Sequence, residues 1–188
     1  MTGKNRAQGR QSSRRRFLAG GLGAIACAAV WPAHAATRID DRRRLSFVNL
    51  HTDEHVDLVY WADGSYEPGA LRRIDNFLRD FRNGEIHQID PQLLDLLVRL
   101  RARLRTTAPF HVISGYRSPA TNAMLAAYTD GVASGSLHMQ GMAIDIRVPN
   151  RPLRQLHKVA LDLEAGGVGY YPRSDFVHVD TGRVRRWG

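Results

Sequence analysis

The sequence has very little cysteine. Its one cysteine, Cys27, lies in an N-terminal segment whose composition differs from that of the rest of the chain. We predict below that this segment is cleaved off as a signal peptide. The remaining chain can then form no disulfide, supply no cysteine nucleophile and build no thiolate metal site. Any metal site must then be built from His, Asp and Glu side chains.

The sequence also lacks an apolar run long enough to cross a membrane. The apolar run at residues 18–30 is shorter than the about 20 residues that a transmembrane helix needs. It follows a basic stretch and precedes Ala-His-Ala at residues 33–35, which has the small-x-small form of a signal-peptidase site. We therefore predict a signal peptide over residues 1–35, a flexible mature N-terminus over 36–44 and one domain over 45–188.

The predicted signal peptide contains an export motif. Residues 13–18, Ser-Arg-Arg-Arg-Phe-Leu, match the twin-arginine signal, in which paired arginines stand just before a mildly apolar segment. This predicts a periplasmic protein exported by the twin-arginine route. A general secretory signal with an arginine-rich head is one alternative. Lipidation at Cys27 is another, although Ala24 fits poorly at the usual leucine-type position before a lipidated cysteine.

Charge gives no indication of nucleic-acid binding. The formal net charge is +9, but six of the basic residues leave with the signal and no acidic residue does, so the mature chain carries about +3. The six are Lys4, Arg6, Arg10, Arg14, Arg15 and Arg16. A modest positive balance suits a protein that works beside an anionic wall or membrane.

Hydrophobic periodicity predicts an α+β domain with helices packed on an antiparallel sheet. The expected strands cover residues 45–51, 55–61, 109–114, 142–148, 166–171 and 176–181, the first two forming a hairpin. The expected helices cover residues 68–82, 91–104, 118–130 and 152–165, and residues 131–137 form a loop. Asp90 and Pro91 supply the N-cap and the first-turn proline of the second helix.

Three residues carry the donor chemistry of a metal site. Asp145 stands between Ile144 and Ile146 in an apolar strand, where an unpaired buried carboxylate would be costly. His138 lies in the preceding loop, and His178 lies in a second apolar strand. If the two strands are neighbours, the three side chains can converge and leave a fourth position open for water, as in a catalytic zinc site. Bound zinc would lower the pKa of that water to about 7.

Taken singly, each of these residues is a weak signal, because a strand histidine is more often a hydrogen-bonded core residue and a nearby aspartate its ion-pair partner. The motifs together say more: Ser114-Gly115-Tyr116-Arg117-Ser118-Pro119, then Ser136-x-His138-x-x-Gly141-x-Ala143-x-Asp145, then Asp175-x-x-His178. In this order they resemble the zinc peptidases of the D-alanyl-D-alanine carboxypeptidase and dipeptidase type, family M15. Within that group the chain is most similar to the MepK (YcbK) branch of murein endopeptidases, over residues 45–187.

The resemblance implies the α+β fold shared with the hedgehog signalling domain, and Zn2+ held by His138, Asp145 and His178. It also implies that Arg117 polarises the scissile carbonyl and stabilises the tetrahedral oxyanion. Asp175 stands where relatives carry the Glu of Glu-x-x-His. That glutamate is the general base that takes a proton from the attacking water and passes it to the leaving amine.

The aspartate at position 175 departs from the family pattern, because it is one methylene shorter than glutamate. Asp180 is the alternative base, since it lies two residues from His178 on the same strand face, about 6.6 Å along. Asp180 can also orient a ligand histidine, and we favour that role. Arg117 has a structural alternative too, in which it braces its turn through backbone carbonyls.

The sequence therefore predicts a zinc-dependent murein endopeptidase that hydrolyses peptide cross-links in peptidoglycan during wall growth or remodelling. One alternative is a D,D-carboxypeptidase or dipeptidase with the same metal and a more closed pocket. Another is a hedgehog-like wall-binding module that keeps zinc without hydrolysis. The expected partners are peptidoglycan peptides, with no nucleic acid. Which cross-link is cut, D-alanyl to diaminopimelate or diaminopimelate to diaminopimelate, stays open, as does the oligomeric state.

Overall fold

The computed structural model describes residues 41–128 and 135–188. The predicted signal peptide lies outside the described residues, as do positions 36–40 and most of the predicted loop at 131–137. The described residues belong to one compact unit. Its first strand already includes residues 43 and 44, so regular structure begins two residues before the predicted boundary at residue 45.

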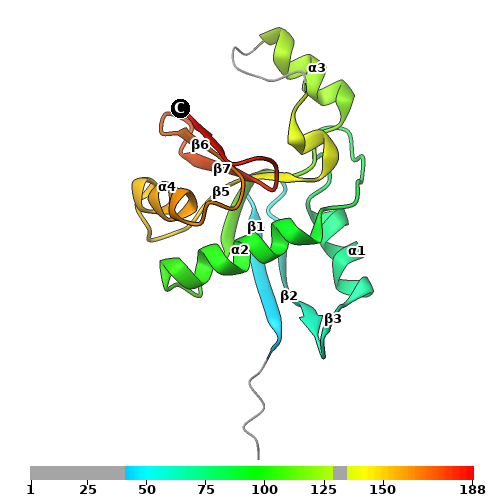
Figure 1. Ribbon diagram of the computed structural model, residues 1–188. Coiled ribbons are helices and arrows are strands. Elements are labelled where there is room, and N and C mark those ends of the chain that lie inside the picture. Colours follow the sequence, from blue (N-terminus) through cyan, green and yellow to red (C-terminus); the bar gives the residue numbers. More distant parts are fainter. Residues whose placement is uncertain (1–40, 129–134) are drawn as a thin grey trace, which may run out of the picture. The chain divides into compact units, whose positions relative to one another are not determined.

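An eight-stranded sheet organises this unit, in the order β3-β2-β1-β4-β5-β7-β6-β8 (Figure 1). The strands are β1 Arg43–Asn49, β2 His55–Ala62, β3 Ser65–Tyr66, β4 Phe110–Ser114, β5 Ala143–Arg147, β6 Gly167–Tyr171, β7 Phe176–Asp180 and β8 Arg185–Trp187. The predicted hairpin is β1 with β2. The short strands β3 and β8 were not predicted, because two or three residues show no periodicity.

The prediction of an antiparallel sheet is wrong for two strand pairs. β1 runs parallel to β4, and β6 runs parallel to β8, while the other neighbours are antiparallel. Between the strands of the first pair the chain passes through β2, β3, α1 and α2, a long connection that allows β4 to run parallel to β1. β6 and β8 are parallel because the chain returns antiparallel to β6 through β7 and then crosses to the other side of β6 to form β8. The sheet is therefore mixed.

Within residues 41–128 and 135–188, four α-helices and one short 3₁₀ helix accompany the sheet: α1 Pro68–Phe77, α2 Pro91–Leu104, α3 Pro119–Tyr128, η1 Leu137–Gln140 and α4 Leu153–Asp162. α2 has the predicted bounds, and the Asp90 side chain accepts a hydrogen bond from the amide of Gln92 as its N-cap. α1 ends at Phe77, before the predicted residue 82. The chain turns there because the Asp80 carboxylate accepts from the amides of Arg82 and Ser118.

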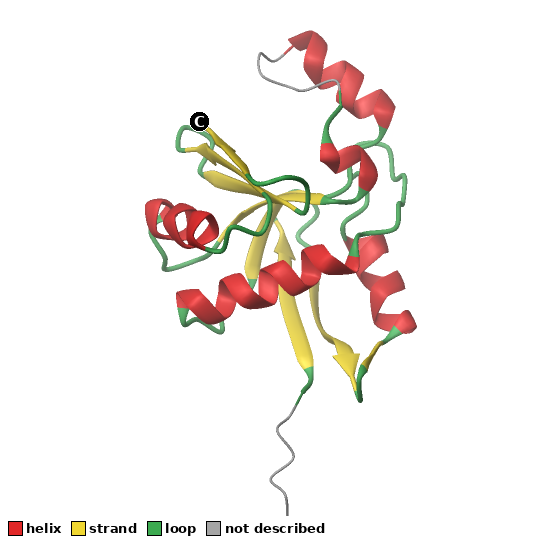
Figure 2. Ribbon diagram, viewed as in Figure 1, coloured by secondary structure: helices red, strands yellow, loops and turns green. Residues whose placement is uncertain are grey.

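The hydrophobic core lies on one face of the sheet, where α2 and α4 pack side by side (Figure 2). Leu93, Leu97 and Leu100 of α2 are fully buried there. Phe47 of β1 meets Phe110 of β4 in the same layer, with ring centroids 6.1 Å apart. We call the opposite sheet face the open face. No helix within the described residues is long and apolar enough to span a membrane.

Candidate metal centre

The ligand candidates of β5 and β7 lie opposite each other in the sheet. The two strands are antiparallel neighbours, and Asp145 is in register with His178. Residues directly opposite in such a pair point to the same face. The strand adjacency on which the predicted site depends is therefore confirmed. Both side chains are buried, although they lie on the open face.

His138 comes to the same place from η1, which precedes β5. The 3₁₀ helix ends at Gln140, and Gly141 caps it with a φ of +67°, a left-handed conformation that favours glycine. A Cβ atom at Gly141 would lie 2.2 Å from the backbone oxygen of Gln88, so no larger residue fits there. The Arg117 amide also donates to the His138 carbonyl, at 3.2 Å. These contacts fix the backbone that presents the His138 ring.

The three donor atoms form a compact triangle. The Nε2 atom of His138 lies 3.1 Å from Nδ1 of His178 and 3.3 Å from Oδ1 of Asp145. Nδ1 of His178 lies 2.9 Å from the same Oδ1. Zinc bonds of about 2.0–2.1 Å in a tetrahedron place ligand atoms about 3.3 Å apart. The donor set and its spacing therefore fit zinc, and we call His138, Asp145 and His178 the ligand cluster.

The second ring nitrogen of each histidine has a partner outside the cluster. Nδ1 of His138 donates to the carbonyl oxygen of Gly115 at 2.7 Å. Nε2 of His178 donates to Oδ2 of Asp180 at 3.0 Å. These bonds assign the protons to the outer nitrogens and leave the inner ones as acceptors for a cation.

Asp180 is fully buried, and donors surround its carboxylate. Besides His178, it accepts from the amides of Gly167 and Gly182 at 3.0 and 2.9 Å, and from Arg185 at 3.0 and 2.8 Å. Burial alone would raise the pKa of Asp180, but these donors hold it well below its usual range. Arg185 has no motif context in the sequence, and only the return of β8 brings it to Asp180.

Charges within the cluster also shift its titration. Burial opposes ionisation of Asp145, yet His138 and His178 hold the pKa of its carboxyl below the ordinary value. Burial lowers the pKa of His178, but Asp145 and Asp180 on either side of its ring outweigh that effect and raise it. The cluster is thus an anionic cage that favours a positive charge at its centre.

Arg117 lies at the edge of the ligand cluster, with its Nη2 atom 3.8 Å from Oδ2 of Asp145. Nη1 reaches Oδ1 of Asn122 at 3.4 Å. Nε is buried and has no hydrogen-bond partner among the described residues. No described backbone carbonyl accepts from the guanidinium, so nothing here supports the alternative in which Arg117 braces its turn.

The turn that carries Arg117 is anchored by Asp80, a residue that the sequence did not single out. The amide of Ser118 donates to Oδ2 of Asp80 at 2.9 Å, and the amide of Arg82 donates to Oδ1 at 3.1 Å. Asp80 is 1% exposed. Burial acts to raise its pKa, but hydrogen bonds from Thr121 and Ser118 lower it below the usual value.

The second predicted catalytic aspartate, Asp175, is not part of the ligand cluster. Its backbone has a φ of +55°, and its Oδ2 atom accepts from Nη1 of Arg147 at 2.6 Å. Its side chain is 59% exposed. Of the two candidate bases, Asp180 therefore contacts a ligand histidine directly, and Asp175 lies at the end of the adjoining strands.

Aromatic side chains line one side of the cluster. The ring of Trp187 lies 5.1 Å from that of His178, and its Nε1 donates to the hydroxyl of Tyr171 at 2.8 Å. The close approach requires glycine at position 169, where a Cβ atom would lie 2.7 Å from the indole. Tyr171 and Trp187 thus form a wall beside the cluster.

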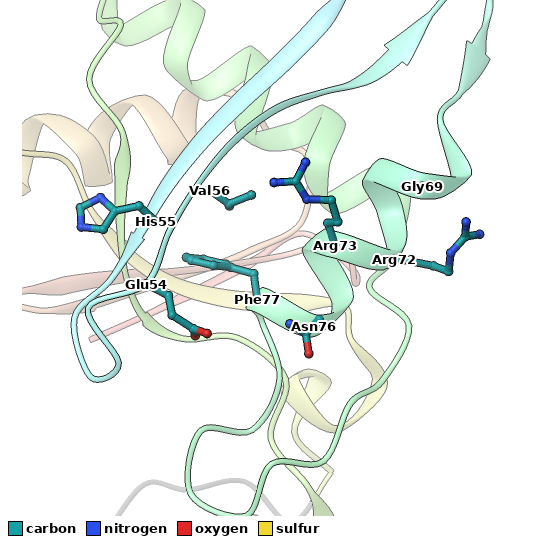
Figure 3. A pocket seen from close by; sticks show the side chains of 8 residues that line it. All are labelled: Glu54, His55, Val56, Gly69, Arg72, Arg73, Asn76 and Phe77. Atoms are coloured by element: carbon teal, nitrogen blue, oxygen red, sulfur yellow. The ribbon is translucent and has the colours of Figure 1, made fainter.

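A cavity of about 420 Å³ lies elsewhere, between β2 and α1 (Figure 3). Residues lining it are Glu54, His55, Val56, Gly69, Arg72, Arg73, Asn76 and Phe77. None of the predicted site residues belongs to this set. The cavity is therefore separate from the metal centre.

Comparison with known proteins shows the family of this chain. The profile of the family described as peptidoglycan L,D-endopeptidase MepK, within peptidase group M15, matches residues 37–187 and so includes all three residues of the ligand cluster. The chain belongs to the MepK family. The MepK L,D-endopeptidase of Escherichia coli (strain K12) is 42% identical over 177 residues, covering 94% of this chain and 97% of that protein. A protein of Haemophilus influenzae named as a probable MepK is 40% identical over 146 residues, covering 77% of this chain and 78% of that protein.

Membership of the MepK family confirms the resemblance drawn from the motifs and places the chain among the metallopeptidases. Peptidases of the M15 group depend on a metal, and the buried His-Asp-His cluster is a group that could hold one. The family match also extends through β8, whose Arg185 and Trp187 contact Asp180 and His178.

Proposed function

We propose that this chain is a zinc-dependent peptidoglycan endopeptidase that hydrolyses peptide cross-links during growth or remodelling of the wall. The observation that carries the proposal is the triangle of donor atoms, with edges of 2.9 to 3.3 Å. His138 and His178 would hold the ion through Nε2 and Nδ1, and Asp145 through its carboxylate. When bound there, zinc supplies a Lewis acid and lowers the pKa of a water molecule to about 7.

Arg117 is proposed to stabilise the developing oxyanion. Its guanidinium is nearly buried beside Asp145, and the unpartnered Nε is a donor whose isolation is costly until an acceptor arrives. A carbonyl oxygen of the substrate supplies that acceptor. Because the charge on this oxygen grows toward the transition state, the interaction is stronger there than in the ground state.

The two aspartates are proposed to have different roles. Asp180 positions the ring of His178, because its carboxylate is buried and already bonded to four residues, and it has no free site for a proton from water. Asp175 is the proposed general base, because its carboxylate is exposed and, among the described residues, pairs with Arg147 alone. Asp175 must exchange that partner before it takes the proton.

The bond cut is proposed to be an L,D bond, by analogy with the names of the relatives. Of the two cross-links considered, diaminopimelate to diaminopimelate joins an L-centre carbonyl to a D-centre amine. The D-alanyl cross-link has a D-centre on both sides. We therefore propose the diaminopimelate cross-link as the substrate.

The site of action is proposed to be the periplasm, reached through the twin-arginine signal at residues 13–18, with residues 45–188 as the catalytic domain. Replacing the arginine pair by lysines should keep a reporter fused to residues 1–35 inside the cell. Export that continues would favour the general secretory route. We also propose that the domain shares its fold with the hedgehog signalling domain.

The proposed function is tested with isolated sacculi and with a monomeric pentapeptide, followed by mass spectrometry of the products. We expect cross-linked dimers to be converted to monomers. A tetrapeptide released from the pentapeptide would indicate a carboxypeptidase instead, and binding to sacculi without any product would indicate a wall-binding module.

Metal dependence is tested in the same assay. Chelation and His138→Ala should each abolish hydrolysis, and zinc should restore the chelated protein but not the variant. His55→Ala removes an exposed histidine on β2 outside the cluster and serves as the control. Hydrolysis that survives both chelation and His138→Ala would contradict the proposal.

A further inference from the structure

A second row of side chains lies beside the ligand cluster on the open face. Arg147 follows Asp145 by two residues on β5, so both side chains point to that face, about 6.6 Å apart along the strand. Arg147 is in register with His111 of β4. On β7, Phe176 precedes His178 by two residues and therefore points to the same face. Phe176 is in register with Tyr171 of β6. We call His111, Arg147, Phe176 and Tyr171 the flanking row.

Arg147 is the cation of this row, and most of its donors are available. Its side chain is 39% exposed, and Nη1 donates to Asp175. Within the described residues no other acceptor contacts its guanidinium. Burial and the charge of Arg147 lower the pKa of His111, which disfavours a second positive charge beside Arg147. A planar guanidinium with free N–H groups is suited to two-point binding of a carboxylate.

The present partner of Arg147 can be displaced. Asp175 is more than half exposed, and it adopts a left-handed backbone conformation that few residues other than glycine adopt. Exposed ion pairs of this kind contribute little to stability, because water and salt screen both charges. A carboxylate arriving with the substrate can therefore replace Asp175 on Arg147.

An aromatic wall borders the same space. The rings of Tyr171 and Phe176 stack with centroids 4.5 Å apart, and both are half-buried. Trp187 continues the wall to His178 through its bond to the Tyr171 hydroxyl. The flanking row thus combines a cation with an apolar surface, next to the centre at which the peptide bond would be cut.

We propose that Arg147 binds the free carboxylate of the D-configured centre on the amine side of the scissile bond, with the methylene stem of that residue against Phe176 and Tyr171. The inference rests on the proposed function. In a diaminopimelate cross-link, the carbon that bears the scissile nitrogen keeps its own carboxylate. When the scissile carbonyl lies at the ligand cluster, this carboxylate lies near the flanking row. Its binding to Arg147 also frees Asp175, the proposed proton acceptor.

The test uses two synthetic cross-linked peptides that differ at one group, the carboxylate of the amine-side D-centre, which is either free or amidated. For the unmodified protein, kcat/KM should fall by about 10- to 100-fold on amidation, the loss of a charge-assisted pair of hydrogen bonds. Arg147→Gln should lose a similar factor on the free acid and cleave both peptides equally well. An unmodified protein that cleaves both equally, or an Arg147→Gln variant that still discriminates, overturns the proposal.

Arg44→Gln is the matched control. Arg44 also lies on a strand and forms an exposed ion pair, with Asp57 at 2.6 and 2.7 Å, but it is on β1, two strands from β5. This variant should discriminate between the two peptides as the unmodified protein does, and thermal unfolding of both variants shows whether they fold. If the unmodified protein cleaves neither peptide, the proposed function itself fails and the role of Arg147 fails with it. Cleavage without discrimination rejects Arg147 alone.

Discussion

Oδ2 of Asp180 lies 3.0 Å from Nε2 of His178, on the side of the imidazole that faces away from the ligand cluster. The bond fixes both the orientation of the ring and the nitrogen that bears its proton. Because Arg185 and two backbone amides hold the carboxylate in turn, the ring is oriented before any metal binds.

Asp180→Asn should therefore weaken zinc binding by about 10- to 100-fold, the usual effect of removing the partner of a ligand histidine. The side chain keeps its shape but loses the charge that raises the basicity of His178. Competition with a fluorescent chelator measures the affinity. Asp57→Asn, which removes an exposed carboxylate on β2, should leave it unchanged. Equal affinities for all three proteins would show that Asp180 does not act on the metal site.

Zinc binding should release a proton, and zinc affinity should fall as the pH falls. Asp145 and Asp180 raise the pKa of His178 against the effect of burial, so the metal-free ring holds its proton to a higher pH than a free histidine does. Zinc requires the neutral ring and must displace that proton below the raised pKa. Calorimetric titration in two buffers of different ionisation enthalpy measures the release. Heats that do not depend on the buffer at mildly acidic pH would contradict the assignment.

Asp80→Asn should lower the free energy of unfolding by about 1–3 kcal/mol at neutral pH, because buried amides lose their charged acceptor. The pKa of Asp80 is lowered in the folded protein, so the stabilisation is complete above the ordinary pKa of about 4 and is lost as the pH falls through the lowered value. Urea unfolding at several pH values measures this difference. It should be largest at neutral pH and shrink in acid.

Two further measurements accompany the Asp80 variant. Asp162→Asn, at an exposed ion pair with Lys158, should change stability by less than about 1 kcal/mol at any pH. Asp80→Asn should also lower kcat, since Asp80 holds the turn that presents Arg117. A stability difference that grows in acid would contradict the sign of the pKa shift.

Asp175→Asn should lower kcat by about 10²- to 10⁴-fold with little change in KM, the signature of a lost general base. Its zinc affinity should match that of the unmodified protein, because Asp175 is not part of the ligand cluster. Steady-state kinetics on a cross-linked peptide measures both constants. A variant with full kcat would remove Asp175 from the mechanism and leave its contact with Arg147 as its role.

The sequence alone determined most of the regular elements and the choice of candidate ligands. The leucine periodicity and the Asp90-Pro91 start gave α2 with its observed bounds, because capping and burial act within one helix. Asp145 and His178 stood out as polar residues in apolar strands, and the order of the motifs added His138 through the family resemblance. Because no cysteine follows the predicted signal peptide, His, Asp and Glu were the residue types available as candidate ligands.

Tertiary structure decided what depends on contacts between distant segments. The parallel pairing of β1 with β4 depends on the long connection through β2, β3, α1 and α2. Local hydrophobic periodicity cannot predict this pairing. Arg185 and Trp187 reach the centre because β8 pairs with β6, an arrangement that three residues cannot signal. The different surroundings of Asp175 and Asp180 also come from the fold. Sequence spacing places both near His178, but only packing buries one among donors and leaves the other exposed beside Arg147.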